Sequence, residues 1–324
     1  MCPICGKSPV LPLFGATSPE ASDGPEFLLV RCQGCGLVRL DPPPSAAQLA
    51  AAYRDQYSPA TAATGASLIA TWGARLFLTA RKRRIERLAR GRRLLDVGCG
   101  TGDFLNVMHE AGWDVAGVEP NAEARRRAPA SLQERIVDTL DAVSGAPFDV
   151  ITLWHVIEHL PSPAADIEKL TTLLRPGGAL FIAVPNFASW EAAIGGTRWF
   201  HLDLPRHLYH FTPETLSHLL DDHGFTVDRI DFFSWIYNVF GAWQTLLNRV
   251  VPERNYLYRR WRQRMPQPAR GSRWRSTICS VLSYAIAPAA AVVAVALSAA
   301  AALAGRSGTI EVVATVRTPA PASS

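Results

Sequence analysis

Two groups of residues in this chain have the types and spacing that bind metals. The first is in the stretch WHVIEHLPSP, where His155, Glu158 and His159 follow the order H-x-x-E-H. One class of zinc peptidases carries this order on a helix, with two His ligands on one face and the Glu as general base. Here Pro161 and Pro163 follow the second His closely and would interrupt such a helix. We therefore expect no catalytic zinc site in this stretch.

The second group lies near the N-terminus. Two pairs of cysteines occur in the stretches CPICG and CQGCG, each pair with two residues between its members and a glycine after it. The four thiols are those of Cys2, Cys5, Cys32 and Cys35. Four thiolates suit a tetrahedral Zn²⁺ ion and leave no coordination position open for catalysis. We expect a structural zinc ribbon over residues 1–40, and the alternative is two unrelated surface pairs.

The composition indicates a folded protein in a reducing compartment. The chain has 324 residues, of which 48% are hydrophobic and 19% are charged, enough to bury a full core. Its N-terminus has neither the basic region nor the apolar stretch of a secretory signal. We expect a cytoplasmic protein, where paired cysteines bind metals more often than they form disulfides. The net charge of +5 is compatible with several anionic partners and selects none of them.

Local patterns predict the elements that surround the cysteines. The stretch EFLLVRC between the two pairs predicts the return strand of a hairpin. Residues 41–90 begin with Asp41 and three consecutive prolines, which form a stiff and extended linker. Helices are expected after this linker, over residues 45–57 and 68–90.

Three glycines follow a buried strand in the stretch LLDVGCGTGDF. Gly98, Gly100 and Gly102 form a tight turn in which the backbone can approach a ligand closely. A helix is expected over residues 103–111, with apolar residues on one side. The next strand, DVAGV, ends in Glu119, about 20 residues beyond the glycines, where a carboxylate can bind a ribose diol. The pattern predicts a βαβ unit that binds a nucleoside.

The glycine spacing narrows the choice of nucleoside. The dinucleotide fingerprint is G-x-G-x-x-G, whereas the spacing here is G-x-G-x-G. Asp96 precedes the turn and Asp103 follows it, so a pyrophosphate would meet two carboxylates unfavourably. A ligand that carries a positively charged ammonium and sulfonium would not be repelled by these carboxylates. The alternative is a glycine-rich turn that binds no ligand.

The stretch LLDVGCGTG followed by GVEPN resembles the class I S-adenosylmethionine-dependent methyltransferases, and the resemblance extends over about residues 91–232. It implies an α/β, Rossmann-like sheet of seven strands, in which GTIEVVATVR is the last strand and is antiparallel. It also implies S-adenosyl-L-methionine as the cofactor. The implied cofactor-binding residues are Asp96, Gly98, Gly100, Gly102 and Glu119, with Asp138, Thr139 and Leu140 on the adenine side.

The same resemblance places His155 after the fourth strand, FDVITL, where the methyl group is transferred. Beyond the fifth strand, closely spaced aromatic and polar residues suit an acceptor pocket. Their block PRHLYHF resembles a group of bacterial methyltransferases often inferred to act on polysaccharides or lipid-linked glycans. An oxygen acceptor must lose a proton, which His accepts near neutral pH, so the candidate bases are His155, His201 and His207. The alternative is a loop whose aromatic residues cover the sheet edge.

A long apolar segment precedes the last strand. Residues 277–304 carry no charge, follow seven closely spaced arginines and are long enough to span a bilayer. A single crossing would leave the strand over residues 308–317 on the far side of the membrane. We therefore expect a helical insertion over residues 235–307 that re-enters or lies on the membrane, with the apolar segment paired with residues 235–251. The alternative is a helical pair that packs on the domain or in a dimer interface.

These observations predict a methyltransferase with its core over residues 91–234 and a flexible tail over residues 318–324. The expected acceptor is a small molecule, a glycan or a lipid-linked sugar at the inner face of the membrane. One alternative is an RNA methyltransferase, but few basic residues lie in the ribbon, so nucleic acid is not expected as a partner. Another is a non-catalytic scaffold, which would tolerate a damaged glycine turn, whereas this turn is intact. Acceptor identity, the methylated atom and the oligomeric state stay open.

Overall fold

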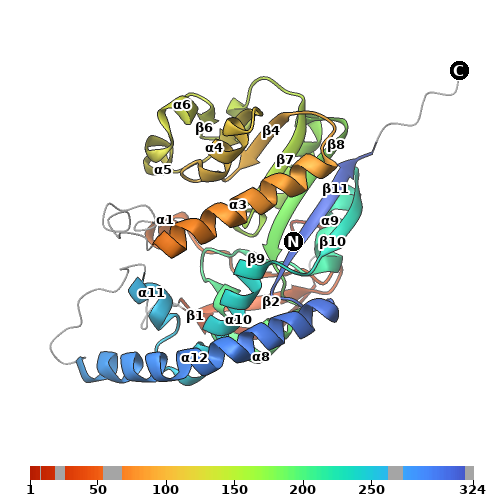
Figure 1. Cartoon of the computed structure of the whole chain (residues 1–324). Helices are drawn as coiled ribbons and strands as arrows, with labels where there is room; N and C mark the ends of the chain where they lie inside the picture. The colour runs from red at the N-terminus through yellow and green to blue at the C-terminus, as the bar shows by residue number, and fades with distance from the viewer. Residues whose placement is uncertain (8, 19–25, 54–67, 262–272, 318–324) are drawn as a thin grey trace, which may run out of the picture. The chain divides into compact units, whose positions relative to one another are not determined.

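The computed structural model describes residues 1–7, 9–18, 26–53, 68–261 and 273–317. The chain forms two compact units whose segments alternate along the sequence (Figure 1). Unit 1 comprises residues 1–65, 185–215 and 231–310, and unit 2 comprises residues 66–184, 216–230 and 311–324. The domain boundaries that we expect from the sequence stay predictions.

A seven-stranded sheet forms the centre of unit 2, in the order β10–β11–β8–β7–β4–β5–β6. Its strands are β4 (Arg93–Val97), β5 (Asp114–Val118), β6 (Ile136–Val137), β7 (Phe148–Trp154), β8 (Leu174–Pro185), β10 (Phe225–Asp231) and β11 (Thr309–Val316). The pairs β4–β5, β4–β7, β5–β6 and β7–β8 are parallel. The last strand, β11, is antiparallel and lies between β8 and β10. The predicted Rossmann-like fold is therefore confirmed.

The core of unit 2 forms where helices pack on the central strands. Strands β4, β7 and β8 are almost continuously buried, as is typical of parallel strands covered on both faces. Helix α4 (Asp103–Glu110) buries Phe104, Leu105 and Met108 on one side, as its spacing predicts, and these pack with Ile85 and Leu94. The other helices here are α3 (Leu68–Leu88), α5 (Ala122–Arg127), α6 (Ala130–Gln133), α7 (Pro163–Leu173) and α9 (Pro213–Asp222).

A four-stranded antiparallel sheet in unit 1 contains strands from distant parts of the sequence. Its order is β1 (Val10–Thr17), β2 (Glu26–Cys32), β3 (Val38–Leu40) and β9 (Tyr209–His210). Strand β2 is the predicted return strand between the cysteine pairs. Strand β9 belongs to the block PRHLYHF and pairs with β3, with His210 opposite Val38 and Tyr209 opposite Arg39. The cysteine segment and this block therefore share one sheet.

Helices make up the rest of unit 1. They are α1 (Ala46–Tyr53), α8 (Trp190–Gly195), α10 (Trp235–Val250), α11 (Tyr256–Trp261) and α12 (Arg273–Leu303). Helix α12 packs along α10, where the Trp243 indole N–H donates to the carbonyl oxygen of Ala287 at 2.9 Å. Within the described part of the chain, residues Trp274–Leu303 of α12 form the one helix long and apolar enough to cross a membrane. The expected pairing of the apolar segment with residues 235–251 is found in the structure.

Several elements differ in extent from the sequence predictions. The expected helix over residues 45–57 ends at Tyr53, and residues 54–57 lie outside the described residues, as does the tail over residues 318–324. The expected third strand, RIVDTL, is reduced to Ile136–Val137. The residues after it turn into the short 3-10 helix η1 (Leu140–Ala142). Only two residues can pair with β5 before this turn.

An ion pair joins α3 to the last strand of unit 2. The Arg84 guanidinium donates to Glu311, whose side chain is 11% exposed. Replacing Glu311 by Gln removes the anion and leaves the cation half-buried, so we expect a loss of about 1–3 kcal/mol in the free energy of unfolding. Urea denaturation measures this loss. Glu110→Gln, at an exposed position of α4, is the control and should cost less than about 0.5 kcal/mol. An equal effect of both substitutions would contradict the role of this ion pair.

Candidate active site

The glycine turn follows the carboxyl end of β4. The φ angles of Gly98, Gly100 and Gly102 are 71°, 57° and 76°, in the left-handed region that favours glycine. A Cβ on Gly98 would lie 2.5 Å from Val156 Cγ2, so the chain passes too closely for a side chain. Gly102 precedes the first residue of α4. The turn therefore presents bare backbone at the start of a helix, where a ligand can approach closely.

Glu119 ties this turn to the end of β5. Its Oε2 accepts a hydrogen bond from the Gly100 backbone N–H at 3.0 Å, and its Oε1 accepts one from the Asn121 backbone N–H at 2.8 Å. The side chain is buried. An ionised carboxylate has about four acceptor positions, so two remain for hydroxyl donors. Glu119 can thus hold the turn and bind the two hydroxyls of a ribose.

Asp96 lies at the end of β4, directly before the turn. Its Oδ1 accepts a hydrogen bond from the Thr152 hydroxyl at 2.5 Å. Burial raises the pKa of Asp96 to about 7, although the Thr152 hydrogen bond and the Arg81 guanidinium both lower it. Because this pKa is close to neutral pH, modest changes around the carboxyl group shift its charge.

The adenine-side candidates stand at the next strand end. Val118 of β5 is opposite Val137 of β6, so Glu119 and Asp138 follow their strands side by side. The Glu119 backbone N–H donates to the carbonyl oxygen of Val137 at 2.9 Å. Asp138 and Thr139 are exposed, and Leu140 begins η1. The structure thus brings these predicted cofactor residues to the same sheet edge as the glycine turn.

His155 follows β7 at this edge and has a φ of 57°, which is uncommon for a residue with a side chain. Its backbone N–H donates to the carbonyl oxygen of Ala183 at 2.9 Å, and its Nδ1 lies 3.5 Å from Glu158 Oε1. Burial, assisted by the positive charge of Arg81, lowers the pKa of His155 to about 3. The imidazole is therefore neutral at pH 7, and it accepts a proton only weakly.

The H-x-x-E-H stretch does not form the peptidase arrangement. Residues Ile157–His159 make one 3-10 turn, named η2, and α7 begins only at Pro163. His155 and His159 therefore do not share a continuous helix. Sequence patterns did not single out Arg81, which lies in a basic run of α3. Its guanidinium stands 3.8 Å from the Trp154 ring centroid and acts on the pKa values of Asp96 and His155.

The other two candidate bases lie in unit 1. His207 Nδ1 is 2.8 Å from the carbonyl oxygen of His201. Because a carbonyl oxygen only accepts, Nδ1 carries the proton and the lone pair of neutral His207 is on Nε2. Asp203, with a left-handed φ of 36°, is paired bidentately with Arg206 and lies 3.7 Å from His207 Nε2. The structure thus brings His201 and His207 together, and His155 belongs to unit 2.

Aromatic rings surround these two histidines. Trp199 and His201 meet edge to face with their ring centroids 5.7 Å apart, and Phe200 meets His201 at 5.0 Å. His210 lies 5.5 Å from Phe187, and burial lowers its pKa to about 3. The surroundings of these histidines are therefore apolar with a few polar atoms, and Trp199, His201 and His210 are themselves buried.

The four N-terminal cysteines converge in unit 1. Their Sγ atoms all lie within 4.8 Å of one another, with 3.7 Å between Cys2 and Cys35 and 3.5 Å between Cys5 and Cys32. A tetrahedron with Zn–S bonds of about 2.3 Å has edges of about 3.8 Å, so these thiols fit a zinc ion. Burial alone would raise the pKa of Cys32, but N–H donors such as those of Cys35 and Gly34 outweigh it and lower this pKa to about 7.

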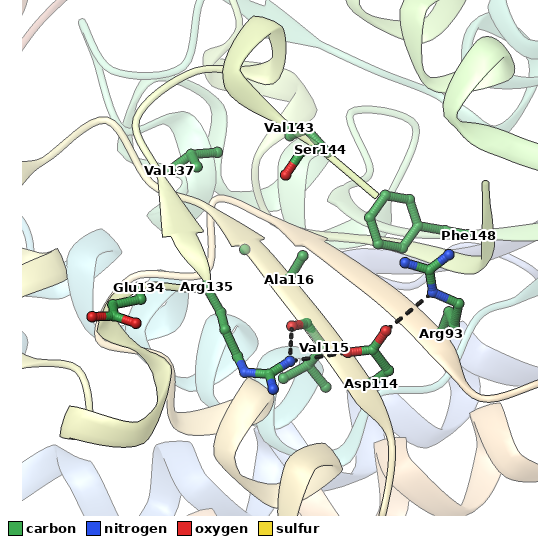
Figure 2. A pocket seen from close by; sticks show the side chains of 11 residues that line it. Arg93, Asp114, Val115, Ala116, Glu134, Arg135, Val137, Val143, Ser144 and Phe148 are labelled. Carbon is green, nitrogen blue, oxygen red and sulfur yellow. Dashed lines mark hydrogen bonds and ion pairs between the residues drawn. The ribbon is translucent and has the colours of Figure 1, made fainter. Parts of the chain in front are cut away.

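A cavity of about 200 Å³ opens at the opposite end of the unit 2 strands (Figure 2). Arg93, Asp114 and Phe148, which are the first residues of β4, β5 and β7, line it. The Asp114 carboxylate accepts hydrogen bonds from Arg93 at 3.1 Å and from Arg135 at 2.9 Å, so both cations have a partner. The glycine turn lies at the carboxyl ends of the strands, whereas Arg93, Asp114 and Phe148 lie at their amino ends.

Sequence comparison shows which known proteins this chain resembles. A family described as a methyltransferase domain matches residues 69–230. A ubiquinone biosynthesis O-methyltransferase of Psychrobacter arcticus is 33% identical over 165 residues, which cover 46% of this chain and 63% of the relative. One of Pectobacterium atrosepticum is 34% identical over 128 residues, which cover 36% of this chain and 53% of the relative. The chain thus spans less than two thirds of the length of these relatives.

A solved structure is similar as well. A SAM-dependent methyltransferase from Archaeoglobus fulgidus superposes with a TM-score of 0.44 and 20% identity, over 74% of this chain and 93% of that chain. The family match covers half of the chain, and it includes the glycine turn, Glu119 and β4 through β8. This chain therefore belongs to the methyltransferase domain family.

Proposed function

We propose that the enzyme transfers a methyl group from S-adenosylmethionine to a small-molecule, glycan or lipid-linked acceptor at the inner face of the membrane. The observation that supports the cofactor site is the hydrogen bond between Glu119 and the Gly100 backbone. It holds the glycine turn and a ribose-binding carboxylate at one sheet edge. The acceptor, the zinc ion and the membrane contact are separate parts of the proposal, each with its own support.

In the cofactor site, we assign the ribose to Glu119 and the close backbone approach to Gly98, Gly100 and Gly102. Asp138, Thr139 and Leu140 follow β6 and are assigned to the adenine. Asp96 provides negative charge near the sulfonium end, and the fraction ionised depends on its raised pKa. When bound, S-adenosylmethionine supplies a methyl group on a sulfonium sulfur, and the protein's main contribution is to hold the acceptor atom in line with it.

We assign binding of the acceptor to the aromatic residues of unit 1 that lie around His201 and His207. The curated relatives are named ubiquinone biosynthesis O-methyltransferases, which favours an oxygen acceptor. Methylation of a hydroxyl releases a proton, and a neutral imidazole can take it. In neutral His207 the lone pair is on Nε2, whereas the low pKa of His155 makes it the weaker proton acceptor.

We also propose that Cys2, Cys5, Cys32 and Cys35 hold a structural Zn²⁺ ion. All six cysteines of the chain are free thiols, so no disulfide competes for these four sulfurs. The ion would hold the turns that flank β2 and β3. Since β3 pairs with β9, the zinc ion would also stabilise the block that contains His207 and His210.

The membrane proposal is supported by the exposed face of α12. Its buried residues follow one side of the helix and include Cys279, Ala290 and Ala294. The opposite side exposes apolar residues, namely Trp274, Ile278, Val281, Tyr284, Val292, Val293, Val295 and Leu303. Exposed apolar surfaces of this extent mark interaction sites. Between Glu253 and Glu311 the sequence has nine arginines and no acidic residue, which complements an anionic lipid surface.

We propose that α12 lies in the plane of the membrane surface. Its 31 residues extend for about 46 Å, and one side is packed against α10, so the apolar face is a strip along the helix. Such helices bury one face at the level of the lipid head groups. This position also leaves β11, which follows α12 directly, on the cytoplasmic side with the rest of unit 2.

The cofactor assignment predicts the effect of two substitutions on binding. Glu119→Ala removes the ribose acceptor and Gly100→Val places a side chain in the turn, so each should weaken S-adenosylmethionine binding at least about 100-fold. Isothermal titration calorimetry measures the affinity. Glu134→Gln, an exposed substitution in unit 2, should bind like the unsubstituted protein. Unchanged affinity in both site variants would remove the assignment.

The zinc assignment predicts about one zinc ion per chain, measured by plasma mass spectrometry on protein purified from zinc-supplemented medium. Cys5→Ser should remove most of this zinc because three thiolates hold the ion far more weakly. Cys279→Ala, at a thiol of α12, is the control and should retain it. Zinc-free protein, or full zinc in Cys5→Ser, would contradict the assignment.

The membrane assignment predicts co-sedimentation of the full chain with vesicles that contain phosphatidylglycerol, with weaker binding at high salt. Val281→Glu combined with Val292→Glu places two charges on the exposed face, where the side chains are 62% and 72% exposed, and should weaken binding at least about tenfold. Leu76→Glu, at an exposed apolar position of α3, is the control. Protein that stays in solution, or equal binding by both variants, would contradict the assignment.

A further inference from the structure

A cleft in unit 1 brings together two arginines from distant parts of the sequence. It has a volume of about 260 Å³, far more than one water molecule needs, and Arg198, Arg254 and Glu26 line it. Glu26 begins β2, Arg198 ends the 3-10 helix η3 (Gly196–Arg198), and Arg254 lies between α10 and α11. All three residues belong to unit 1, so a single unit forms the cleft.

Arg198 is held at the carboxyl end of α10. Its Nη1 donates to the carbonyl oxygens of Asn248 and Val251, to the latter at 2.9 Å. Its Nη2 donates to the Pro252 carbonyl oxygen at 3.2 Å, and the Asn248 side-chain amide donates to the Arg198 carbonyl oxygen at 3.0 Å. A basic side chain at this end of a helix satisfies its last carbonyl groups. These partners fix the guanidinium in place, but none of them carries a full negative charge.

Arg254 is held in a similar way by β1 and η3. Its Nη2 donates to the carbonyl oxygen of Thr17 at 2.5 Å and to the Thr17 hydroxyl at 2.9 Å. Its Nη1 donates to the carbonyl oxygen of Thr197 at 2.9 Å. In the described part of the chain, the hydrogen bonds of both guanidiniums therefore go to uncharged oxygen atoms.

Two fixed cations without a counter-ion favour a bound anion. Burial lowers the pKa of Arg254, and the positive charge of Arg198 lowers it further, so the two guanidiniums are close enough to repel each other. An anion beside both would offset this repulsion. None of the hydrogen bonds above uses Nε, so each guanidinium retains this donor for a ligand. Guanidinium donors match the oxygen atoms of a phosphate group.

Among the described residues that line the cleft, Glu26 supplies the one carboxylate. A Cβ on Gly15 would lie 2.2 Å from Glu26 Oε1, so the carboxylate occupies the space over this glycine. Within the described part of the chain it forms no ion pair with either arginine. A carboxylate accepts hydrogen bonds from hydroxyl groups and repels further anions. The cleft therefore suits a ligand in which one phosphate lies close to hydroxyl groups, as in a sugar phosphate.

The cleft adjoins the aromatic residues that we assign to the acceptor. Arg198 directly precedes Trp199, and Trp199 belongs to the same apolar cluster as Ala16, which lines the cleft. The next residue, Phe200, is fixed on α10, because its backbone N–H donates to the Thr245 hydroxyl at 3.1 Å. A ligand bound through its phosphate in the cleft is thus held beside these aromatic residues.

We propose that Arg198 and Arg254 bind the phosphate group of a sugar phosphate, and that this site anchors the phosphorylated end of the acceptor. The guanidiniums donate to the phosphate oxygens, and Glu26 accepts a hydrogen bond from a sugar hydroxyl. The inference deepens the proposed function and rests on it for the identity of the ligand as the acceptor, because a lipid-linked sugar is joined to its lipid through phosphate. No bond of the ligand is made or broken at this site.

Phosphorus-31 NMR titration of glucose 1-phosphate with the full chain tests the site. We expect a dissociation constant of about 1 mM or lower, which is the upper end of common KM values, and weaker binding of inorganic phosphate. Arg254→Gln should weaken binding of both at least about tenfold. Arg306→Gln is the matched control, because Arg306 is an exposed arginine of unit 1 that donates to the Ala188 carbonyl oxygen at 3.1 Å. No binding, or equal binding by Arg254→Gln and Arg306→Gln, would overturn the proposal.

A second variant leaves both arginines and their hydrogen bonds in place. Glu26→Gln removes the negative charge from the cleft, so it should strengthen binding of inorganic phosphate about two- to fivefold. Glu214→Gln, an exposed substitution in the first turn of α9, should leave this affinity unchanged. Unchanged or weaker phosphate binding by Glu26→Gln would contradict the assignment of the cleft, even if Arg254→Gln does not fold.

The phosphate of a lipid head group is the other source of this chemistry. We expect Arg254→Gln to bind phosphatidylglycerol vesicles as well as Arg306→Gln does. A tenfold loss of vesicle binding by Arg254→Gln, with glucose 1-phosphate binding unchanged, would assign the cleft to head groups and overturn the proposal. These measurements require neither S-adenosylmethionine nor methyl transfer, so failed cofactor binding would overturn the proposed function without removing the phosphate site.

Discussion

The hydrogen bond from the Gly100 backbone to Glu119 joins the carboxyl ends of β4 and β5. It fixes the glycine turn in a left-handed backbone and leaves acceptor positions of the carboxylate available for hydroxyl donors. The parallel sheet brings Asp96, His155 and Asp138 to this same edge, because the strands before them end in register. A single constraint thus organises the candidate cofactor site of unit 2. The membership in the methyltransferase family agrees with this arrangement.

The pairing of β3 with β9 has a comparable role in unit 1. It makes the cysteine segment and the block PRHLYHF parts of one sheet, although about 170 residues separate them in sequence. Trp199, Leu202 and Leu204 pack in the same cluster as Leu29 and Val38 of the N-terminal strands. His207 and His210, which lie in this block, are therefore supported by the cysteine segment. A metal ion at the four thiols would stabilise that support without taking part in the reaction.

Much of the fold and of the candidate site could be predicted from local sequence patterns. The features that the sequence did not predict have a common physical cause. Continuous apolar runs predicted the central strands, the glycine spacing predicted the turn, and the paired cysteines predicted a cluster that the structure contains. The role of Arg81 was missed, because its position over the Trp154 ring depends on tertiary packing. The shortness of β6 follows from the turn into η1, which strand propensity does not reveal.

The central claim is that a sulfonium nucleoside binds across the glycine turn with its ribose on Glu119. A crystal structure of the protein with S-adenosylhomocysteine measures this most directly. The account predicts both ribose hydroxyls within about 2.6–3.2 Å of the Glu119 carboxylate oxygens, and the glycine turn in contact with the ligand. A ligand bound elsewhere in the protein, with Glu119 contacting only backbone, would contradict the account.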